Sequence, residues 1–256
     1  MNPRPANNRI RLWAVAFWLL VWQGVSMTLS ALYPHGHLLL ASPLSVATRI
    51  LELAVTAAFW QSVLGSASHI LGGFLLSCAA GVLLAALAAR FSRVAELLSP
   101  LVAAVKAVPV VSFIILALVW LDADDLPLFI AALMVFPPVY LNVLEGIRQT
   151  NRQLLEMARV FRVPFSRQLR GIYLPAVLPY FRTAVSLGLG LCWKSGVAAE
   201  VIGLPTGSIG EALYNSKVYY MTPDLFAWTA VIVAVSILFE RLFLKGVDAL
   251  AGKVGA

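Results

Sequence analysis

The chain has 256 residues, of which 61% are hydrophobic and only 12% are charged, and its mean hydropathy is +0.87. About a quarter of the residues of a soluble domain are charged, so this composition excludes an ordinary soluble protein. The net charge of +7 would suit a nucleic-acid partner, but the basic residues lie between apolar runs rather than on one folded face. Cys78 and Cys192 both lie inside apolar runs, so we expect packing residues rather than a disulfide.

Residues 1–33 begin with the polar, basic run MNPRPANNRIR and continue as an apolar run from Leu12 to Tyr33. A membrane-spanning helix needs about 20 apolar residues, and this run is long enough. A cleavable signal peptide is the alternative. Its apolar core is usually shorter, and this one contains the bulky Trp13, Trp18 and Trp22. We therefore expect a retained leading transmembrane helix.

Residues 34–61 are less apolar and are expected to form an external interfacial segment. Val46, Ile50, Leu53 and Ala57 recur at helical spacing, which predicts a helix lying at the outer membrane surface. The pair His35 and His37 has no third ligand nearby, so no metal site is expected there.

The next span is predicted from about Ser66 to Ala89, within a core bundle covering residues 66–244. It carries a ridge of small residues four apart: Gly73, Ser77, Gly81, Ala85 and Ala89. Small side chains let helix backbones approach closely in lipid. The ridge could face another subunit or another helix of the same chain, and packing within the chain is slightly favoured.

A third span is expected from about Leu97 to Leu121 and a fourth from about Leu126 to Leu144, separated by an acidic loop. The third contains Pro100, Lys106 and Pro109, and the fourth contains Pro137-Pro138. Prolines at membrane depth are tolerated where neighbouring groups satisfy the freed carbonyls, so both helices should lie inside a bundle. Kinks around a transport path and simple packing kinks both remain possible interpretations.

Residues 151–175, NRQLLEMARVFRVPFSRQLRGIYLP, form the longest charged stretch away from the termini. Leu154, Ala158 and Phe161 share a helical face, and Phe165, Leu169 and Ile172 repeat the pattern after Pro164. Two short amphipathic helices at an angle suit a docking surface for a soluble partner. An ordinary basic loop retained on the inner side of the membrane is an equally open interpretation.

A fifth span from about Ala176 to Glu200, a polar re-entrant or interfacial stretch, and a sixth span from Leu225 to Leu244 complete the chain. With six spans and a cytoplasmic N-terminus, only Arg49 and Lys217 lie outside, and Lys106 and Lys194 lie within spans. The inner side then holds the remaining fifteen basic residues: Arg4, Arg9, Arg11, Arg90, Arg93, Arg148, Arg152, Arg159, Arg162, Arg167, Arg170, Arg182, Arg241, Lys245 and Lys253. This bias predicts that both termini and residues 151–175 are cytoplasmic.

Glu156-Met157-Ala158, then three residues, Arg162, nine residues, and Ile172-Tyr173-Leu174-Pro175 resemble the EAA signature of ABC transporter permeases. That signature runs E-A-A, three residues, G, nine residues, I-x-L-P. Here Met157 replaces the first Ala and Arg162 replaces the Gly. We expect the turn at Arg162 to be made differently from a glycine turn, with help from Pro164.

A second run, Trp193 to Gly203, resembles the end of the fifth helix in nitrate, sulfonate and taurine permeases, as do Leu213-Tyr214 and Phe226-Ala227-Trp228. The resemblance covers residues from about Gly65 to Phe243. It implies an all-α type I importer fold: a polytopic bundle, here of six transmembrane helices in a single permease domain over residues 1–256. The leading span would be additional to the family's five-helix core.

The family resemblance also implies partners and a location in a prokaryotic inner membrane. A dimer of ABC ATPase subunits would dock on Glu156, Met157, Ala158, Phe161, Arg162, Pro164, Ile172, Leu174 and Pro175. A second permease subunit, expected to be an identical copy, would complete the channel, and an extracytoplasmic solute-binding protein would deliver the solute. The sequence has no G-x-x-x-x-G-K-[ST], H-E-x-x-H or G-x-S-x-G motif, so we expect neither enzymatic activity nor a cofactor.

Ionisable residues inside a membrane are costly and often functional, which singles out Lys106, Lys194 and Glu200 as candidates for the transport path. A lysine beside the path could attract a sulfonate, nitrate or carboxylate group. Alternatively, Lys194 pairs with a carbonyl or with Glu200, or extends to the membrane surface.

Two other functions stay open on the sequence. An ion-gradient-driven secondary transporter usually has paired repeats with broken helices, and no convincing repeat is present. A membrane anchor or assembly protein would have no transport path. Neither rival predicts a nucleotide-binding partner.

Overall fold

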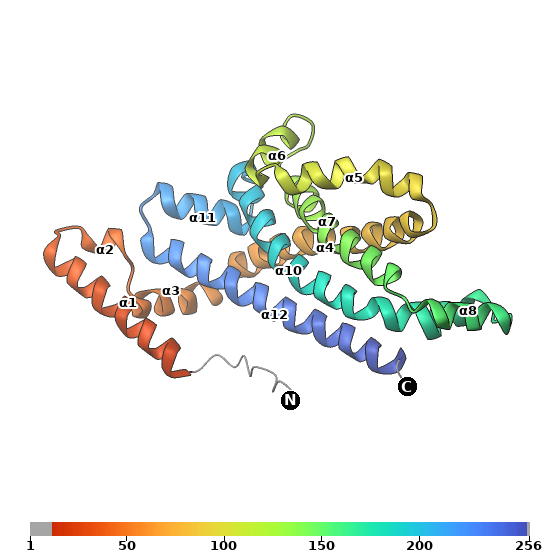
Figure 1. Ribbon diagram of the computed structural model, residues 1–256. Helices are drawn as coiled ribbons and strands as arrows, with labels where there is room; N and C mark the ends of the chain where they lie inside the picture. The colour runs from red at the N-terminus through yellow and green to blue at the C-terminus, as the bar shows by residue number, and fades with distance from the viewer. Residues whose placement is uncertain (1–11, 255–256) are drawn as a thin grey trace. The chain divides into compact units, whose positions relative to one another are not determined.

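The computed structural model describes residues 12–254, and this part of the chain is helical, with no β-strand. Internal contacts divide the chain into two compact units, one formed by residues up to Phe59 with Ala212–Val231 and one by Trp60–Glu211 with Ile232 onward. The helices are α1 (Leu12–Leu32), α2 (Gly36–Leu39), α3 (Pro43–Ala54), α4 (Ala57–Arg90), α5 (Ser92–Ala107), α6 (Val110–Ala117), α7 (Leu126–Arg148), α8 (Arg152–Val160), α9 (Phe165–Gln168), the π-helix η1 (Leu169–Tyr173), α10 (Leu174–Gly203), α11 (Ile209–Val218) and α12 (Thr222–Val254) (Figure 1).

The described residues contain five helical segments that are long and apolar enough to cross a membrane. The third expected span, from about Leu97 to Leu121, is not one helix. It consists of α5 and α6, which meet at an angle of 105° and pass the same test only as a pair. Pro109 caps α6 and has no N–H to continue the α5 ladder, which explains the break. The all-α polytopic fold is confirmed, with five continuous spans and one broken candidate.

Other expected boundaries shift because the helices are longer than their apolar runs. Helix α4 begins at Ala57, nine residues before the expected Ser66, so the end of the 34–61 segment belongs to a spanning helix. Helix α7 continues through Pro137 and Pro138 without a break. The side-chain amide of Asn142 donates to the Pro138 carbonyl at 2.8 Å, one turn earlier.

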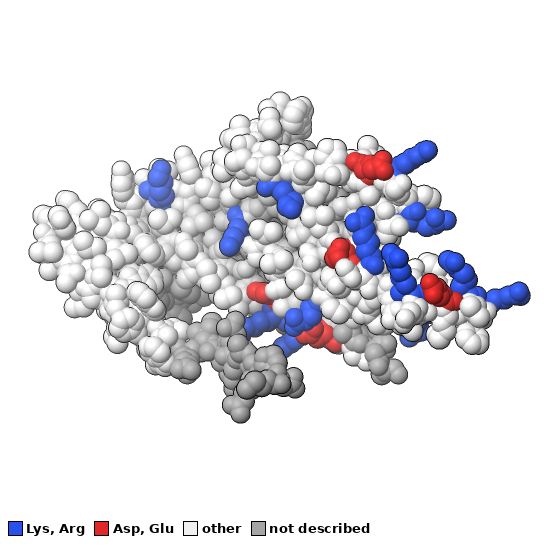
Figure 2. Space-filling model, in the orientation of Figure 1, with Lys and Arg blue, Asp and Glu red and all other residues white. Residues whose placement is uncertain are grey.

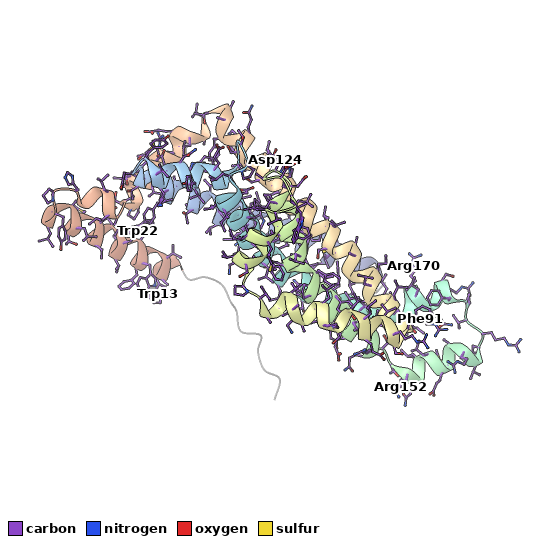
Figure 3. The ribbon with its side chains drawn as sticks, turned by 90° about the horizontal axis from the view of Figure 1, so that it is seen from above. Trp13, Trp22, Phe91, Asp124, Arg152 and Arg170 are labelled. Carbon is purple, nitrogen blue, oxygen red and sulfur yellow. The ribbon has the colours of Figure 1, made fainter. Side chains whose placement is uncertain are left out.

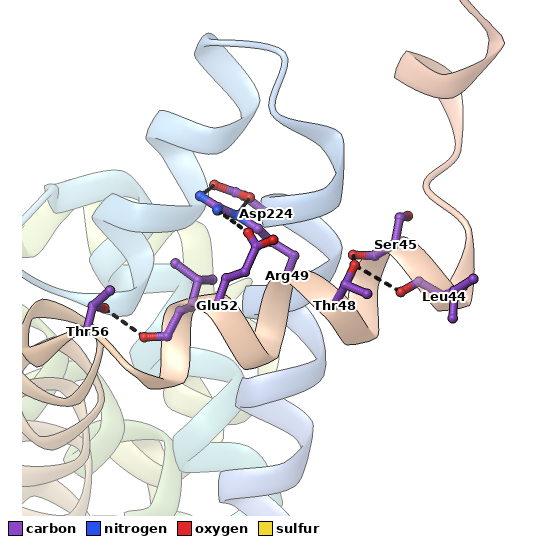
Figure 4. A network of polar contacts seen from close by, with 8 residues as sticks. Leu44, Ser45, Thr48, Arg49, Glu52, Thr56 and Asp224 are labelled. Atoms are coloured by element: carbon purple, nitrogen blue, oxygen red, sulfur yellow. Dashed lines mark hydrogen bonds and ion pairs between the residues drawn. The ribbon is translucent and has the colours of Figure 1, made fainter.

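In the first unit, Arg49 of α3 forms ion pairs with Asp224 of α12 and with Glu52 of its own helix. The Arg49 guanidinium donates to both carboxylate oxygens of Asp224 and, at 2.7 Å, to Glu52 (Figure 4). These acceptors raise the pKa of Arg49 above its usual value, Asp224 contributing most. The exposed face instead carries Leu44, Leu51 and Val55. Helix α3 therefore packs Val46, Ile50 and Leu53 inside the first unit and leaves a second set of apolar residues exposed.

Two further contacts in the first unit join α2 and α1 to the start of α12. The Thr222 hydroxyl donates to the Leu38 carbonyl at 2.7 Å, and the Trp22 and Phe226 rings lie 5.6 Å apart. Ala41, Val46 and Ala227 form the buried cluster beneath them. The helix expected within residues 34–61 is therefore present as α3, with the Ser42 side chain capping its first turn.

The second unit is organised around α4, α7 and α10, which approach one another closely (Figure 1). A Cβ placed on Gly73 would lie 2.2 Å from the Leu128 carbonyl oxygen of α7, and one on Gly81 would lie 2.7 Å from Val139 Cγ1. The ridge of small residues on α4 thus packs against α7 within the chain. Gly196 of α10 makes the same kind of approach to Ile70 of α4, at 2.6 Å.

The later part of α12 packs on this core through its aromatic side chains and through polar contacts. Phe243 stacks edge-to-face on Phe74 with ring centroids 5.1 Å apart, and Phe239 lies 5.8 Å from Trp193. The Ser186 hydroxyl also donates to Glu240 at 2.9 Å. These contacts join the later part of α12 to α4 and α10.

The neighbouring glycines Gly72 and Gly73 provide a test of the α4–α7 packing. Gly73→Ala forces a Cβ against backbone and should cost about 1–3 kcal/mol, lowering the thermal midpoint in detergent. Gly72→Ala is the matched control, because its Cβ would meet only Leu128 Cδ1 at an ordinary 3.4 Å. Equal midpoints for the two variants would contradict this packing.

Candidate functional site

The segment expected to dock a partner begins with a well-capped helix, α8. The Asn151 side chain accepts a hydrogen bond from the Gln153 N–H at 2.8 Å, which satisfies one free donor of the first turn. Of the expected stripe Leu154, Ala158 and Phe161, only Ala158 is buried, at 1% exposure, whereas Phe161 is 74% exposed. The exposed surface of α8 also includes Glu156, Met157 and Val160.

Helix α8 ends in a left-handed turn at Arg162, whose φ is +49°. The Arg162 N–H donates to the Arg159 carbonyl at 3.1 Å, and the Val163 N–H donates to the Ala158 carbonyl at 2.8 Å. These two bonds form a Schellman motif, which normally has glycine at this position. The expectation of a different turn is therefore wrong: Arg162 adopts the glycine-like conformation itself, at a cost of about 1–2 kcal/mol.

Pro164 and the residues after it do not form a separate second helix. Pro164 caps α9, and α9, η1 and α10 follow one another without a break, so that residues Phe165–Gly203 form one continuous span of 39 residues. The expected start of the fifth span at Ala176 is thus eleven residues too late. Ile172, Leu174 and Pro175 belong to this continuous helix rather than to a loop.

Helix α8, the turn at Arg162 and α9 together form a corner over residues 152–168, which we call the α8–α9 corner. This corner is strongly basic. Figure 2 shows Lys and Arg side chains gathered over the end of the second unit that carries α8. Figure 3 places Arg152, Arg170 and Phe91 at this end and Asp124 of the acidic loop at the other. The exposed apolar residues Phe161 and Phe165 therefore lie among positive charges, a combination common at protein interfaces.

Lys106 and Lys194, 88 positions apart in sequence, line the same groove. It has a volume of about 690 Å³ and lies between the end of α5, the middle of α7 and α10. Its walls include Pro137, Pro138 and Asn142 of α7. Both lysines have exposed side chains, so their ammonium groups are available to a solute in the groove.

A second groove of about 620 Å³ adjoins the first, because Lys106 and Leu141 line both. It leads along α5 and α7 to Arg148, a residue that the sequence did not single out. Neither groove has an acidic side chain among its described lining residues. The two together form a surface with three positive charges, which favours anions.

Glu200 lies apart from this surface and is 1% exposed. Its carboxylate accepts a hydrogen bond from the Gly210 N–H at 2.9 Å, in the first turn of α11. The neighbouring Ile209 N–H donates to Ser66 Oγ, also at 2.9 Å. Glu200 and Ser66 thus satisfy two N–H groups that a helix start leaves free, which the sequence did not reveal. A role for Glu200 in a transport path stays a prediction.

The buried contact at Glu200 can be tested with two variants. Glu200→Ala leaves the Gly210 N–H without its acceptor and should cost about 1–3 kcal/mol in the stability of the purified protein. Glu200→Gln keeps an acceptor oxygen and should retain most of that stability and all of the transport. Loss of transport in a stable Glu200→Gln variant would show that the charge itself is needed.

The chain is similar to the membrane components of known transport systems. The family model described as the inner membrane component of binding-protein-dependent transport systems matches residues 80–249. A Bacillus subtilis (strain 168) permease, provisionally named for aliphatic sulfonate transport, is 28% identical over 80% of this chain and 77% of its own. A riboflavin transport permease of Chloroflexus aurantiacus is 30% identical over 89% of this chain and 86% of its own.

The taurine transport permease of Escherichia coli K12 is 25% identical over 88% of this chain and 82% of its own. These relatives are membrane components without enzymatic activity, and the ATPase of such systems is a separate subunit. The matched residues include α7, the α8–α9 corner and α10. The chain belongs to the family of binding-protein-dependent ABC transport permeases of the inner membrane.

Proposed function

We propose that this chain forms the translocation path of an ATP-driven importer for a small anionic solute and receives the ATPase on its α8–α9 corner. The observation that carries the proposal is the exposed apolar and basic corner at the start of the continuous helix that bears Lys194. Two identical copies would enclose the path, with an ATPase dimer on the inner side and a solute-binding protein outside.

The proposed contact with the ATPase is supported by the exposed aromatic residues of the α8–α9 corner. Phe161 and Phe165 are 74% and 69% exposed, an unusual state for two aromatic residues among so many charges. Aromatic side chains and arginines are the residues that most often dominate protein interfaces. Glu156, exposed on the same helix, can pair with a basic residue of the partner.

The continuous helix provides a physical link between the corner and the groove. From Phe165 to Lys194 the helix rises by about 40 Å. Because no break separates α9, η1 and α10, a displacement of the corner moves the Lys194 backbone as well. Nucleotide-driven motion of the ATPase would in this way reach the groove wall directly.

The anionic solute is supported by the two adjoining grooves with Lys106, Lys194 and Arg148. Two of the relatives are named for sulfonate and taurine transport, and both of these solutes carry a sulfonate group. The riboflavin permease shows that the family also serves larger solutes, so the charge of the groove is the more specific argument.

The inside bias of basic residues supports a cytoplasmic location of the α8–α9 corner. That bias is the strongest topological signal in short loops. The acidic loop that holds Asp124 lies at the opposite end of the second unit, where the outer surface would be (Figure 3). Counting α5 and α6 as one broken span gives six candidate spans, and this even number supports the proposal that both termini are cytoplasmic.

Docking can be tested by charge and polarity changes on α8. Phe161→Asp and Glu156→Lys should each weaken co-purification of the ATPase at least about 30-fold, as for interface hot spots, while the protein still inserts. Glu96→Lys is the control, since it makes the same charge change on an exposed site of α5. Full ATPase binding and transport by both α8 variants would refute the docking assignment.

The anion path can be tested in vesicles containing the complete system. Uptake of an aliphatic sulfonate, taurine and riboflavin is compared for wild type, Lys106→Gln, Lys194→Gln and the control Lys217→Gln on α11. Each groove variant should lower uptake of the transported anion about 5- to 30-fold at low concentration, because a charged contact is lost. Uptake of riboflavin alone, or uptake unchanged in both groove variants, would contradict an anionic cargo.

A further inference from the structure

A third groove lies near the α8–α9 corner and has no role in the proposed transport. Its volume is about 540 Å³, and it is bounded by the end of α4, the end of α7 and the α9–η1–α10 segment. Its walls are almost wholly apolar and include Val82, Ala86, Val143, Phe165 and Leu169. Among the lining residues that the structure describes, Arg90 alone is charged, and it stands at the last position of α4.

We propose that this groove is a binding site for one anionic phospholipid, with an acyl chain along α4 and α10 and the headgroup phosphate at Arg90. Phosphatidylglycerol is the simplest lipid with this chemistry. The site goes beyond the transport function, because a lipid there would be a structural or regulatory ligand rather than cargo.

The position of the groove along α4 fits a lipid chain. Arg90 is the last residue of α4, a candidate membrane span, and in this proposal the basic rim lies at the polar surface of the membrane. From Arg90 to Val82 the helix rises by about 12 Å. One leaflet of the hydrocarbon core is about 15 Å thick. The apolar wall therefore extends over most of the depth that an acyl chain occupies.

The positive charge of Arg90 at the rim of the groove favours an anionic ligand. Arg90 makes no ion pair with any residue between 12 and 254. Its guanidinium carbon lies 5.4 Å from the centre of the Phe91 ring, a contact that positions the charge without neutralising it. Figure 3 places Arg170 of η1 at the same end of the second unit as Phe91, and Arg170 directly follows the lining residue Leu169 in the sequence. Basic pockets between spanning helices on the inner side are typical sites for anionic lipid headgroups.

The groove also borders the second amphipathic stripe. Phe165 and Leu169 remain exposed to a large extent although they line the groove. An acyl chain would cover their inner faces and brace the π-helical turn that joins the corner to α10. Lipid composition would then influence how firmly the corner is held.

The test is native mass spectrometry of the full permease, alone and with its ATPase, after equilibration with phosphatidylglycerol or phosphatidylcholine. Wild type should retain one phosphatidylglycerol per chain in preference to phosphatidylcholine. Arg90→Gln should reduce that preference about fivefold, as expected for one basic residue, whereas Arg93→Gln should not change it. Ala86→Trp fills the groove and should abolish retention of both lipids, whereas Leu83→Trp, on an exposed site of α4, should not.

Equal retention of the two lipids by wild type would overturn the proposal, as would full retention by Ala86→Trp. Displacement of the bound lipid by soluble glycerol phosphate would show a simple phosphate site instead. Cross-linking of Ala86→Cys to the ATPase or to a second permease would show that a protein covers the groove. None of these results depends on which solute is transported, so failure here leaves the anion path untouched.

Discussion

The structure depends on the close approach of α7 to α4 and α10. In lipid, helices gain little from excluding water, so they associate through close packing and need small residues where backbones meet. Gly73 and Gly81 let α4 approach α7, and Gly196 lets α10 approach α4. This three-helix contact fixes the groove with Lys106 and Lys194 on one side and the apolar groove with Arg90 on the other.

The same bundle connects the α8–α9 corner to the rest of the second unit. A basic, partly apolar corner on a mobile loop could bind a partner without changing the rest of the protein. Here the corner continues into α10, whose inner face is buried against α7 along much of its length. In the proposed mechanism, a force applied at the corner would reach the groove of Lys194 through this packed helix. Neither an ion-driven transporter nor an anchor would need such a connection, and the family assignment agrees with the ATP-driven alternative.

Composition and apolar run length were enough to predict the all-α membrane fold, because a bilayer requires long apolar helices. The spacing from Glu156 to Pro175 likewise located the corner. Helix limits were less predictable: the continuous helix that contains α10 begins at Phe165, because polar residues can extend a helix beyond the membrane and hydropathy does not register them. The left-handed Arg162 also escaped prediction, because two backbone hydrogen bonds of the Schellman motif outweigh the cost of a side chain there.

The sequence could not show which of the candidate residues lie close together in space. Lys106 and Lys194 were each picked out by their cost in lipid, but only the fold shows that they share a groove and that Arg148 lies in the adjoining one. Glu200 was also picked out because an ionisable group is costly in lipid. The structure shows that its carboxylate accepts a hydrogen bond from the Gly210 N–H, which offsets that cost.

The central claim is that the α8–α9 corner contacts the ATPase and moves with it. Its most direct test is a photo-activatable residue at position 161, irradiated in membranes that contain the assembled transporter. The account predicts a covalent product with the ATPase subunit whose yield changes between the nucleotide-free and ATP-bound states. A product formed only with lipid, with a second permease, or with the external binding protein would contradict it.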